Sequence, residues 1–394
     1  MTTTAPKEKT TPARATLPCT LREFFLYFLK LGAFGFGGPI ALAGYMQRDL
    51  VERRRWVSTK DYVEGLALAQ LAPGPLAAQL AMYLGWVRAG VVGATVVSAA
   101  FVLPSFAIVI VLSALYVHYG GLPWMQGIFY GIGAAVIGII ARSAWKLVTM
   151  TLHRDWLLWS LFGVAAVVTA WTESEIVWVF LGAGVVALLA RGRPPLSSSS
   201  ALGAFAPVAL ASVASGPPVA SLWKVGLYFA EAGAFVFGSG LAIVPFLHGG
   251  VVKEFHWLTE RQFLDAVAVA MITPGPVVIT VAFIGYLVAG PLGATVAALG
   301  VFLPPYLLVV IPAPYFRKFA ANRSIKAFVD GVTAAATGAI AGAAFVLGRR
   351  AIIDVPTAFI CAATLVVMFK LRRVPEPLII VVAGIVGLVW KGGP

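Results

Sequence analysis

Two Pro-Gly-Pro segments lie within long apolar stretches, at 73–75 and at 274–276. Proline removes a backbone donor and glycine permits unusual dihedral angles, so a helix is expected to stop at each segment. A helix that restarts in an apolar medium leaves its first amides unpaired, and the positive end of its dipole favours an anion. We expect the amides at 76–78 and 277–279 to face one central space. A single break more often only kinks a helix, but its repetition favours a binding site.

A glycine-rich element precedes each break. In the first, Gly35, Gly37 and Gly38 are followed by Pro39, whereas the second reads Phe-Gly-Ser-Gly at 237–240. Such glycines permit either a nest of backbone amides around an anion or a close crossing of two helices. The second element lacks the glycine–proline pair, which leaves open whether both halves bind a substrate equally.

Charged residues within the apolar stretches are further candidates, because a charge in a membrane without a partner is unfavourable. Lys30 corresponds to Glu231, 201 positions later. The two form either an ion pair that fixes the helices or a substrate contact and a proton carrier. Glu64 corresponds to Asp265 in the same register. Both are candidates for proton coupling, although capping or snorkelling at the membrane interface is the interpretation that we favour.

Two glutamines, Gln70 and Gln79, flank the first break, whereas Met271 and Thr280 occupy the matching positions at the second. The first half of the site is therefore expected to be the more polar. The candidate substrate site comprises Lys30, Gly35, Gly37, Gly38, Pro39, Gln70, Pro73, Gly74, Pro75, Gln79, Gly238, Gly240, Pro274, Gly275 and Pro276, with Glu64, Glu231 and Asp265 as candidates for coupling.

The sequence offers little for catalysis. Its four histidines do not share a metal-ligand spacing on one helix face. It has no phosphate-binding Gly-Lys-Ser/Thr loop, nucleophile elbow or dinucleotide fingerprint. We therefore expect no metal, no cofactor and no enzymatic activity.

Composition places these residues in a membrane. With 60% hydrophobic residues, 11% charged residues and a mean hydropathy of +0.91, the 394-residue chain has too little polar surface for a water-soluble globule. The formal charge of +13 comes from short Lys and Arg clusters between apolar runs, which is typical of loops that orient a membrane protein. We expect the lipid bilayer as a partner, and no nucleic acid.

The apolar runs predict an all-α polytopic membrane protein, because a membrane span needs about 20 residues at 1.5 Å each. Those cut by Pro-Gly-Pro become broken or re-entrant half-helices of about 12 residues, too short to cross a bilayer. The runs cover 21–46, 61–87, 89–117, 124–148, 156–171, 174–190, 220–248, 262–288, 290–312, 325–348, 355–370 and 377–391.

The sequence contains an internal duplication. The segment 56–75 recurs at 257–276, and 85–104 pairs with 285–304 after a one-residue slip. Broken helices at matching positions of two repeats are typical of secondary transporters and indicate a site between the halves. We divide the chain into a cytoplasmic tail (1–20), a first repeat (21–190), a linker (191–219) and a second repeat (220–394).

Loop charges predict how the repeats are oriented. Lys and Arg gather at 47–60 and 142–154 in the first repeat but at 317–326 and 370–373 in the second, which match uncharged loops of the first. Since positive loops stay in the cytoplasm, this pattern predicts an inverted repeat. Inversion requires an odd number of crossings before the second repeat, and 201–215 is either the extra crossing or part of a flexible linker. Arg349 and Arg350 lie on the wrong side in this scheme.

The glycine element at 34–39, Trp56, the run 70–75 and the second break at 274–276 occur in an order that resembles the chromate ion transporter family, in its long two-domain bacterial form. The similarity extends from residue 21 to residue 390. The resemblance implies a multi-pass secondary transporter that exports chromate across the inner membrane and gives chromate resistance. Sulfate is a chemical analogue. Chromate is a tetrahedral dianion with acceptor oxygens only, so amides of helix N-termini and of glutamines suit it.

Three alternatives stay open. The first is a transporter of sulfate or another inorganic anion, and the second is an anion channel. The third, a membrane enzyme such as a chromate reductase, lacks a recognisable cofactor site. The oligomeric state is not fixed by the sequence, and a homodimer is one option.

Overall fold

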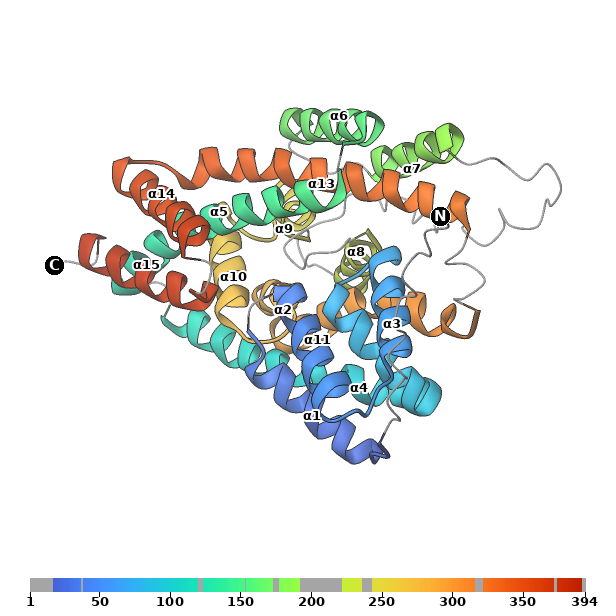
Figure 1. The fold of residues 1–394 in the computed structure, drawn as a ribbon. Helices are drawn as coiled ribbons and strands as arrows, with labels where there is room; N and C mark the ends of the chain where they lie inside the picture. Colours follow the sequence, from blue (N-terminus) through green and yellow to red (C-terminus); the bar gives the residue numbers. More distant parts are fainter. Residues whose placement is uncertain are drawn as a thin grey trace, which may run out of the picture.

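The computed structural model describes residues 17–36, 38–119, 123–152, 154–172, 177–191, 222–235, 243–315, 322–371 and 374–391. Within these ranges all regular structure is helical, which confirms the all-α prediction (Figure 1). Most of the tail and the stretch 201–215 lie outside the described residues. The first repeat contains α1 (Leu21–Phe34), α2 (Gly38–Met46), η1 (Gln47–Arg53), α3 (Thr59–Leu71), α4 (Leu76–Tyr119), α5 (Pro123–Thr151), α6 (Trp156–Thr172) and α7 (Val177–Arg191). The second contains α8 (Leu222–Phe235), α9 (Ile243–His248), η4 (Gly249–Glu254), α10 (Glu260–Ile272), η5 (Val277–Ile279), α11 (Thr280–Val310), η6 (Ala313–Tyr315), α13 (Arg323–Ala351), α14 (Val355–Lys370) and α15 (Glu376–Lys391).

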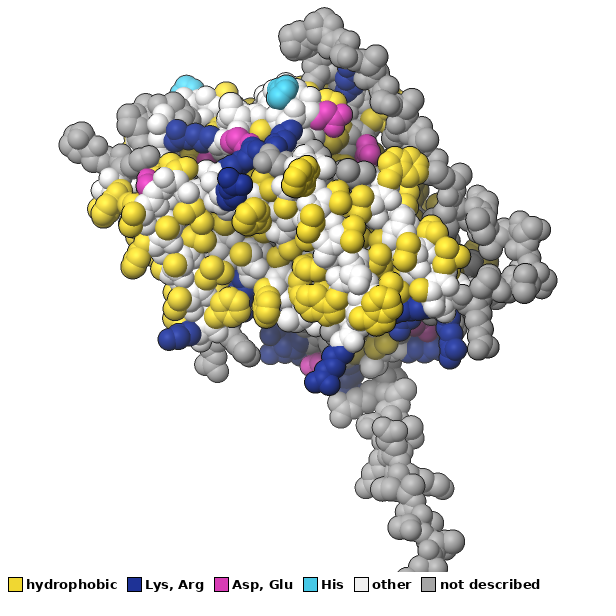
Figure 2. Space-filling model, turned by 90° about the horizontal axis from the view of Figure 1, so that it is seen from above, with side chains coloured by type: hydrophobic (Ala, Val, Ile, Leu, Met, Phe, Trp, Pro, Cys, Tyr) yellow, Lys and Arg dark blue, Asp and Glu magenta, His cyan; other side chains and the backbone are white. Residues whose placement is uncertain are grey.

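Apolar helices dominate the part of the chain that is described. By length and composition, four stretches could cross a membrane: Leu76–Tyr119, Trp124–Lys146, Val277–Tyr315 and Arg323–Ala351. The apolar helices α6, α7, α14 and α15 are shorter. Figure 2 shows hydrophobic side chains across the middle of one face, with Lys and Arg gathered at its upper and lower margins. This distribution is typical of an apolar belt between two charged ends.

The duplication extends to the local backbone geometry. The π-helices η1 and η4 occupy matching positions in the two repeats. Each is followed by a non-glycine residue with positive φ, Arg55 at 54° and His256 at 52°. Such a conformation is uncommon for these residue types, so its recurrence shows that the repeats share irregular details as well as helix order.

A sharp turn divides both α4 and α11. In α4, Ala89 and Gly90 have non-helical dihedral angles, with φ of Gly90 at 58°; Ala289 and Gly290 repeat this geometry in α11. The chain folds back on itself there. Gly85, before the turn, packs against Gly93, after it, so closely that a Cβ added to Gly85 would lie only 2.5 Å from the Gly93 carbonyl oxygen. Each element is therefore a short helix followed by a long one.

The short helix 76–88 packs back on α3 as a hairpin. Gly65 of α3 lies against the ring of Tyr83, where a Cβ would overlap it. Ser58 caps α3 by accepting a hydrogen bond from the Asp61 amide, and Thr259 caps α10 in the same way. The hairpin thus presents its tip, residues 72–75, away from the capped end.

The two repeats exchange their long helices. α5 of the first repeat packs against α14 and α15 of the second, and α13 of the second packs against α6 and α7 of the first, along one side of α13 in Figure 1. Small residues allow these close crossings. Gly131 lies against the Ala383 carbonyl, and Gly338 against the Phe162 carbonyl. Neither repeat is therefore packed on its own.

Candidate functional site

Both Pro-Gly-Pro segments lie between helices. α3 ends at Leu71 and α4 begins at Leu76, while α10 ends at Ile272 and η5 begins at Val277. The central glycines adopt positive φ angles, 140° at Gly74 and 91° at Gly275, a region that favours glycine over residues with a Cβ.

Each Pro-Gly-Pro break lies close to residues of the opposite repeat. The Gly275 amide donates a hydrogen bond to the Gly35 carbonyl oxygen, with 2.9 Å between N and O. The second break is thereby tied to the glycine element of the first repeat. Gly275 also lies against Ser105 of α4, and in the matching arrangement a Cβ on Gly74 would lie 2.6 Å from Cβ of Pro305 in α11. Each break therefore contacts the long helix of the other repeat.

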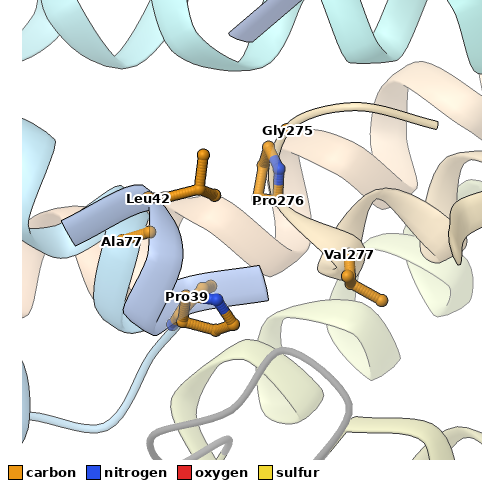
Figure 3. Close-up of a pocket in the computed structure, with 7 residues that line it drawn as sticks. Pro39, Leu42, Ala77, Gly275, Pro276 and Val277 are labelled. Atoms are coloured by element: carbon orange, nitrogen blue, oxygen red, sulfur yellow. The ribbon is translucent and has the colours of Figure 1, made fainter. Parts of the chain in front are cut away.

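A small cavity lies where the two breaks meet (Figure 3). Pro39, Leu42 and Ala77 lie on one side of it, and Gly275, Pro276 and Val277 lie on the other. Pro75 completes the lining. The lining side chains are all apolar, so polar contacts with a ligand have to come from the backbone.

The helix starts at the two breaks differ. In α4 the first intrahelical bond runs from the Gln79 amide to the Pro75 oxygen, at 3.0 Å. The three preceding amides, at 76–78, have no hydrogen-bond partner among the described residues. At the second break a 3₁₀ turn forms first, and the Ile279 amide bonds to the Pro276 oxygen at 3.0 Å. Three free amides at 277–279 were expected, but this turn uses one of them, and those at 277 and 278 have no partner among the residues that the structure describes.

Gln79 is fully buried beside the first break, with an exposure of 0%. Its Nε2 donates to the Pro73 oxygen at 2.7 Å. Because that oxygen can only accept, the amide orientation is fixed, and Oε1 is left without a partner among the described residues. An unpaired buried acceptor is unfavourable and calls for a ligand or water. Gln70, the other glutamine predicted here, is exposed.

Only some of the remaining predicted site residues can be placed at the site. Lys30 is exposed on α1 and Glu231 is half-buried on α8, and no ion pair joins these two described residues. The structure therefore does not bring them together. Gly38 begins α2, whereas Gly37, Gly238 and Gly240 lie outside the described residues.

The two carboxylates suggested for coupling lie in different surroundings. Asp265 is buried, with an exposure of 4%, and its Oδ2 accepts a hydrogen bond of 2.7 Å from the Tyr116 hydroxyl. Glu64 is half-buried, and its Oε2 lies 3.4 Å from the Tyr83 hydroxyl. Interfacial capping is thus the wrong interpretation for Asp265, since Thr259 caps its helix. Tyr116 was missed because nothing in its sequence context marks a contact with the other repeat.

No metal site is apparent in the described ranges, where no three His, Cys, Asp or Glu side chains lie close enough to share an ion. His248 instead forms a hydrogen bond with Glu260, with 2.7 Å between Nε2 and Oε2, and Glu260 also pairs with Arg350. Cys19 and Cys361 are free and buried.

Comparison with known proteins identifies the relatives of this chain. The family model described as chromate transporter matches it twice, at residues 22–188 and 223–388, which confirms the internal repeat. A chromate transport protein of Cupriavidus metallidurans is 58% identical over 374 residues, covering 94% of this chain and 93% of the relative. A probable chromate transport protein of Synechococcus elongatus is 58% identical, covering 94% and 96%. A chromate transport protein of Pseudomonas aeruginosa is 34% identical, covering 82% and 80%.

None of the solved structures matches the chain significantly. The relatives above are named as transport proteins and not as enzymes, in agreement with the expectation that this chain is not an enzyme. The apolar helices and the twofold match together show that this multi-pass integral membrane protein belongs to the chromate transporter family.

Proposed function

We propose that this protein is a secondary active transporter that exports chromate from the cytoplasm across the bacterial inner membrane and thereby gives resistance to chromate. The names of the two relatives at 58% identity support chromate as the substrate. Sulfate, with the same shape and charge, is the competitor to test. We further propose that the chain consists of a tail, two repeats and a linker, and that residues 201–215 form an additional membrane crossing.

The observation that carries the proposal is the meeting of the two breaks. Unpaired amides at 76–78 and at 277 and 278 begin the helices on either side of a cavity that both repeats line. Helix N-termini in a site closed off from water favour an anion that only accepts hydrogen bonds. The buried Gln79 amide lies beside the same turn. We place the chromate site here.

Packing between the repeats supports alternating access. Thr95 lies near the start of the long helix in α4, and its hydroxyl lies 2.7 Å from that of Tyr306, near the end of the matching helix in α11. This contact is expected if matching helices run in opposite directions, as in an inverted repeat. In such an arrangement, movement of one repeat against the other exposes the shared site to one side at a time.

Transport into inside-out vesicles tests the proposal. Vesicles containing the protein should accumulate labelled chromate when their interior is acidified, while potassium with valinomycin holds the membrane potential near zero. A protonophore should release the chromate, and empty vesicles should take up little. Equilibration without accumulation would indicate a channel, and accumulation of sulfate alone would show that chromate is not the substrate.

A further inference from the structure

Asp265 is the most enclosed carboxylate in the described ranges, where no other Asp or Glu side chain is fully buried. It lies on α10, surrounded by α4, α5, α11 and α15. An ionised carboxylate in such a place is unfavourable unless it is paired, and acidic residues at membrane depth mark proton or ion pathways. The position of Asp265 therefore requires an explanation beyond packing.

The partner of Asp265 comes from the other repeat. The Tyr116 hydroxyl donates to its Oδ2 at 2.7 Å, a normal length for a hydrogen bond between two oxygens. Two aromatic rings hold the phenol edge-on: Phe129 of α5 at 5.5 Å and Phe283 of α11 at 5.2 Å between centroids. The hydroxyl is therefore positioned firmly, and one hydrogen bond joins α10 of the second repeat to α4 of the first.

The matching carboxylate of the first repeat lies beside a tyrosine of its own repeat. The Tyr83 hydroxyl, in the same hairpin, lies 3.4 Å from Oε2 of Glu64. Counting back from Gly85 and Gly285, the residue that matches Tyr83 is Phe283, which has no hydroxyl. Asp265 thus depends on the opposite repeat for its donor. The two halves of the protein are unlike at this point, and the hydrogen bond of Asp265 depends on their relative position.

The surroundings of Asp265 contain few other charges. Among the described residues of the elements packed around it, the groups that act on it electrostatically are Tyr116 and Arg261. Arg261 is exposed, lies one turn nearer the start of α10, and donates to Gln126 of α5 at 3.4 Å. The gain or loss of one proton at Asp265 therefore changes the net charge of the Asp265–Tyr116 contact by one unit.

We propose that Asp265, held by Tyr116, is the proton-binding group that couples transport to the proton gradient. Ionised Asp265 forms a charge-assisted bond that fixes α10 against α4. When the carboxylate takes up a proton from the acidic side, that bond becomes neutral and weaker, so the repeats are released to move. The same proton leaves to the opposite side once the anion has crossed. The inference rests on the proposed function and adds the identity of its coupling residue.

Vesicle transport separates coupling from movement of the anion. For Asp265→Asn we expect complete loss of accumulation driven by the pH gradient, while exchange of internal unlabelled for external labelled chromate continues. Glu52→Gln, which removes an exposed carboxylate, should leave both activities unchanged. Wild-type vesicles that neither accumulate nor exchange chromate would defeat the proposed function. Wild-type accumulation that survives Asp265→Asn, or that is lost instead in Glu64→Gln, would defeat only this inference.

Tyr116→Phe provides the second variant, for the case in which Asp265→Asn yields no folded protein. The phenol stabilises the ionised carboxylate, so its loss leaves the proton bound up to a higher pH. The pH profile of chromate accumulation should then shift to more alkaline values, with exchange retained. Tyr83→Phe, the matched change beside Glu64, should leave the profile in place. An unshifted profile in Tyr116→Phe would overturn the assignment.

Discussion

Replacing Gly275 by alanine should weaken both the fold and transport, because three features of this glycine are lost together. A Cβ there would overlap the Ser105 hydroxyl and lie 3.2 Å from the Gly32 oxygen, which corresponds to overpacking of about 1–3 kcal/mol. A positive φ adds about 1–2 kcal/mol for a residue with a Cβ. Displacing the amide from the Gly35 oxygen removes a hydrogen bond of about 1 kcal/mol.

The expected loss of unfolding free energy is therefore about 3–6 kcal/mol, as the approximate total of strain, overlap and the lost bond. Gly90→Ala is the matched control, since Gly90 also has a positive φ but a Cβ there meets nothing within 4 Å. It should lower stability by about 1–2 kcal/mol, the backbone contribution alone. Thermal unfolding of the purified protein and chromate uptake by vesicles measure the two consequences.

A second substitution identifies the contact responsible. Ser105→Ala removes the hydroxyl that the new Cβ would overlap, so the double variant should recover part of the stability lost in Gly275→Ala, although Cβ of residue 105 stays 3.2 Å away. The recovery should be about 1 kcal/mol in a double-mutant cycle. If Gly275→Ala is no less stable than Gly90→Ala, or if Ser105→Ala restores nothing, the second break does not contact the first repeat as described.

Other contacts make further predictions. Gln79→Met removes a half-satisfied buried amide, so stability should change by less than about 1 kcal/mol while labelled chromate uptake is lost; retained uptake would exclude Gln79 from the path. Tyr306→Phe should lower stability by about 1 kcal/mol by thermal unfolding, but it should have little effect in a Thr95→Val background, where the bond between the two hydroxyls is already missing. Tyr130→Phe removes a 2.6 Å bond to Asp354 and should lower stability by about 1.5–3 kcal/mol with uptake per folded molecule unchanged, whereas a loss of uptake at equal stability would place Tyr130 in the path.

Local chemistry explains which parts of the fold could be predicted from the sequence. A proline–glycine–proline segment combines a missing backbone donor with a residue that permits unusual dihedral angles, and α3 and α10 end at Leu71 and Ile272, two residues before Pro73 and Pro274. The sharp turn at Ala89 and Gly90 likewise falls at the start of the predicted apolar run 89–117, next to the end of the run 61–87. These features depend on neighbours in the chain and need no knowledge of the tertiary contacts.

Contacts between distant segments explain what the sequence did not reveal. Lys30 was predicted to lie in the site because it is a charge in an apolar run. The buried face of α1 is instead formed by residues such as Phe24 and Phe28, and Lys30 is exposed. Tyr116 and Asp265 lie 149 positions apart, so only the packing of the two repeats shows them as a pair. The exchange of long helices is equally hidden, because small-residue faces look alike along α5 and α13.

That exchange has a consequence for how the chain is made. α5 leaves the ribosome early, yet α14 and α15, the helices that cover its glycine face, are the last described helices of the chain. During synthesis the first repeat must wait in the bilayer with Gly131 uncovered, because the Ala383 carbonyl that lies against it does not yet exist. A chain truncated after α13 would therefore lack the two helices that pack against α5 of the first repeat, whereas α13 would still pack against α6 and α7.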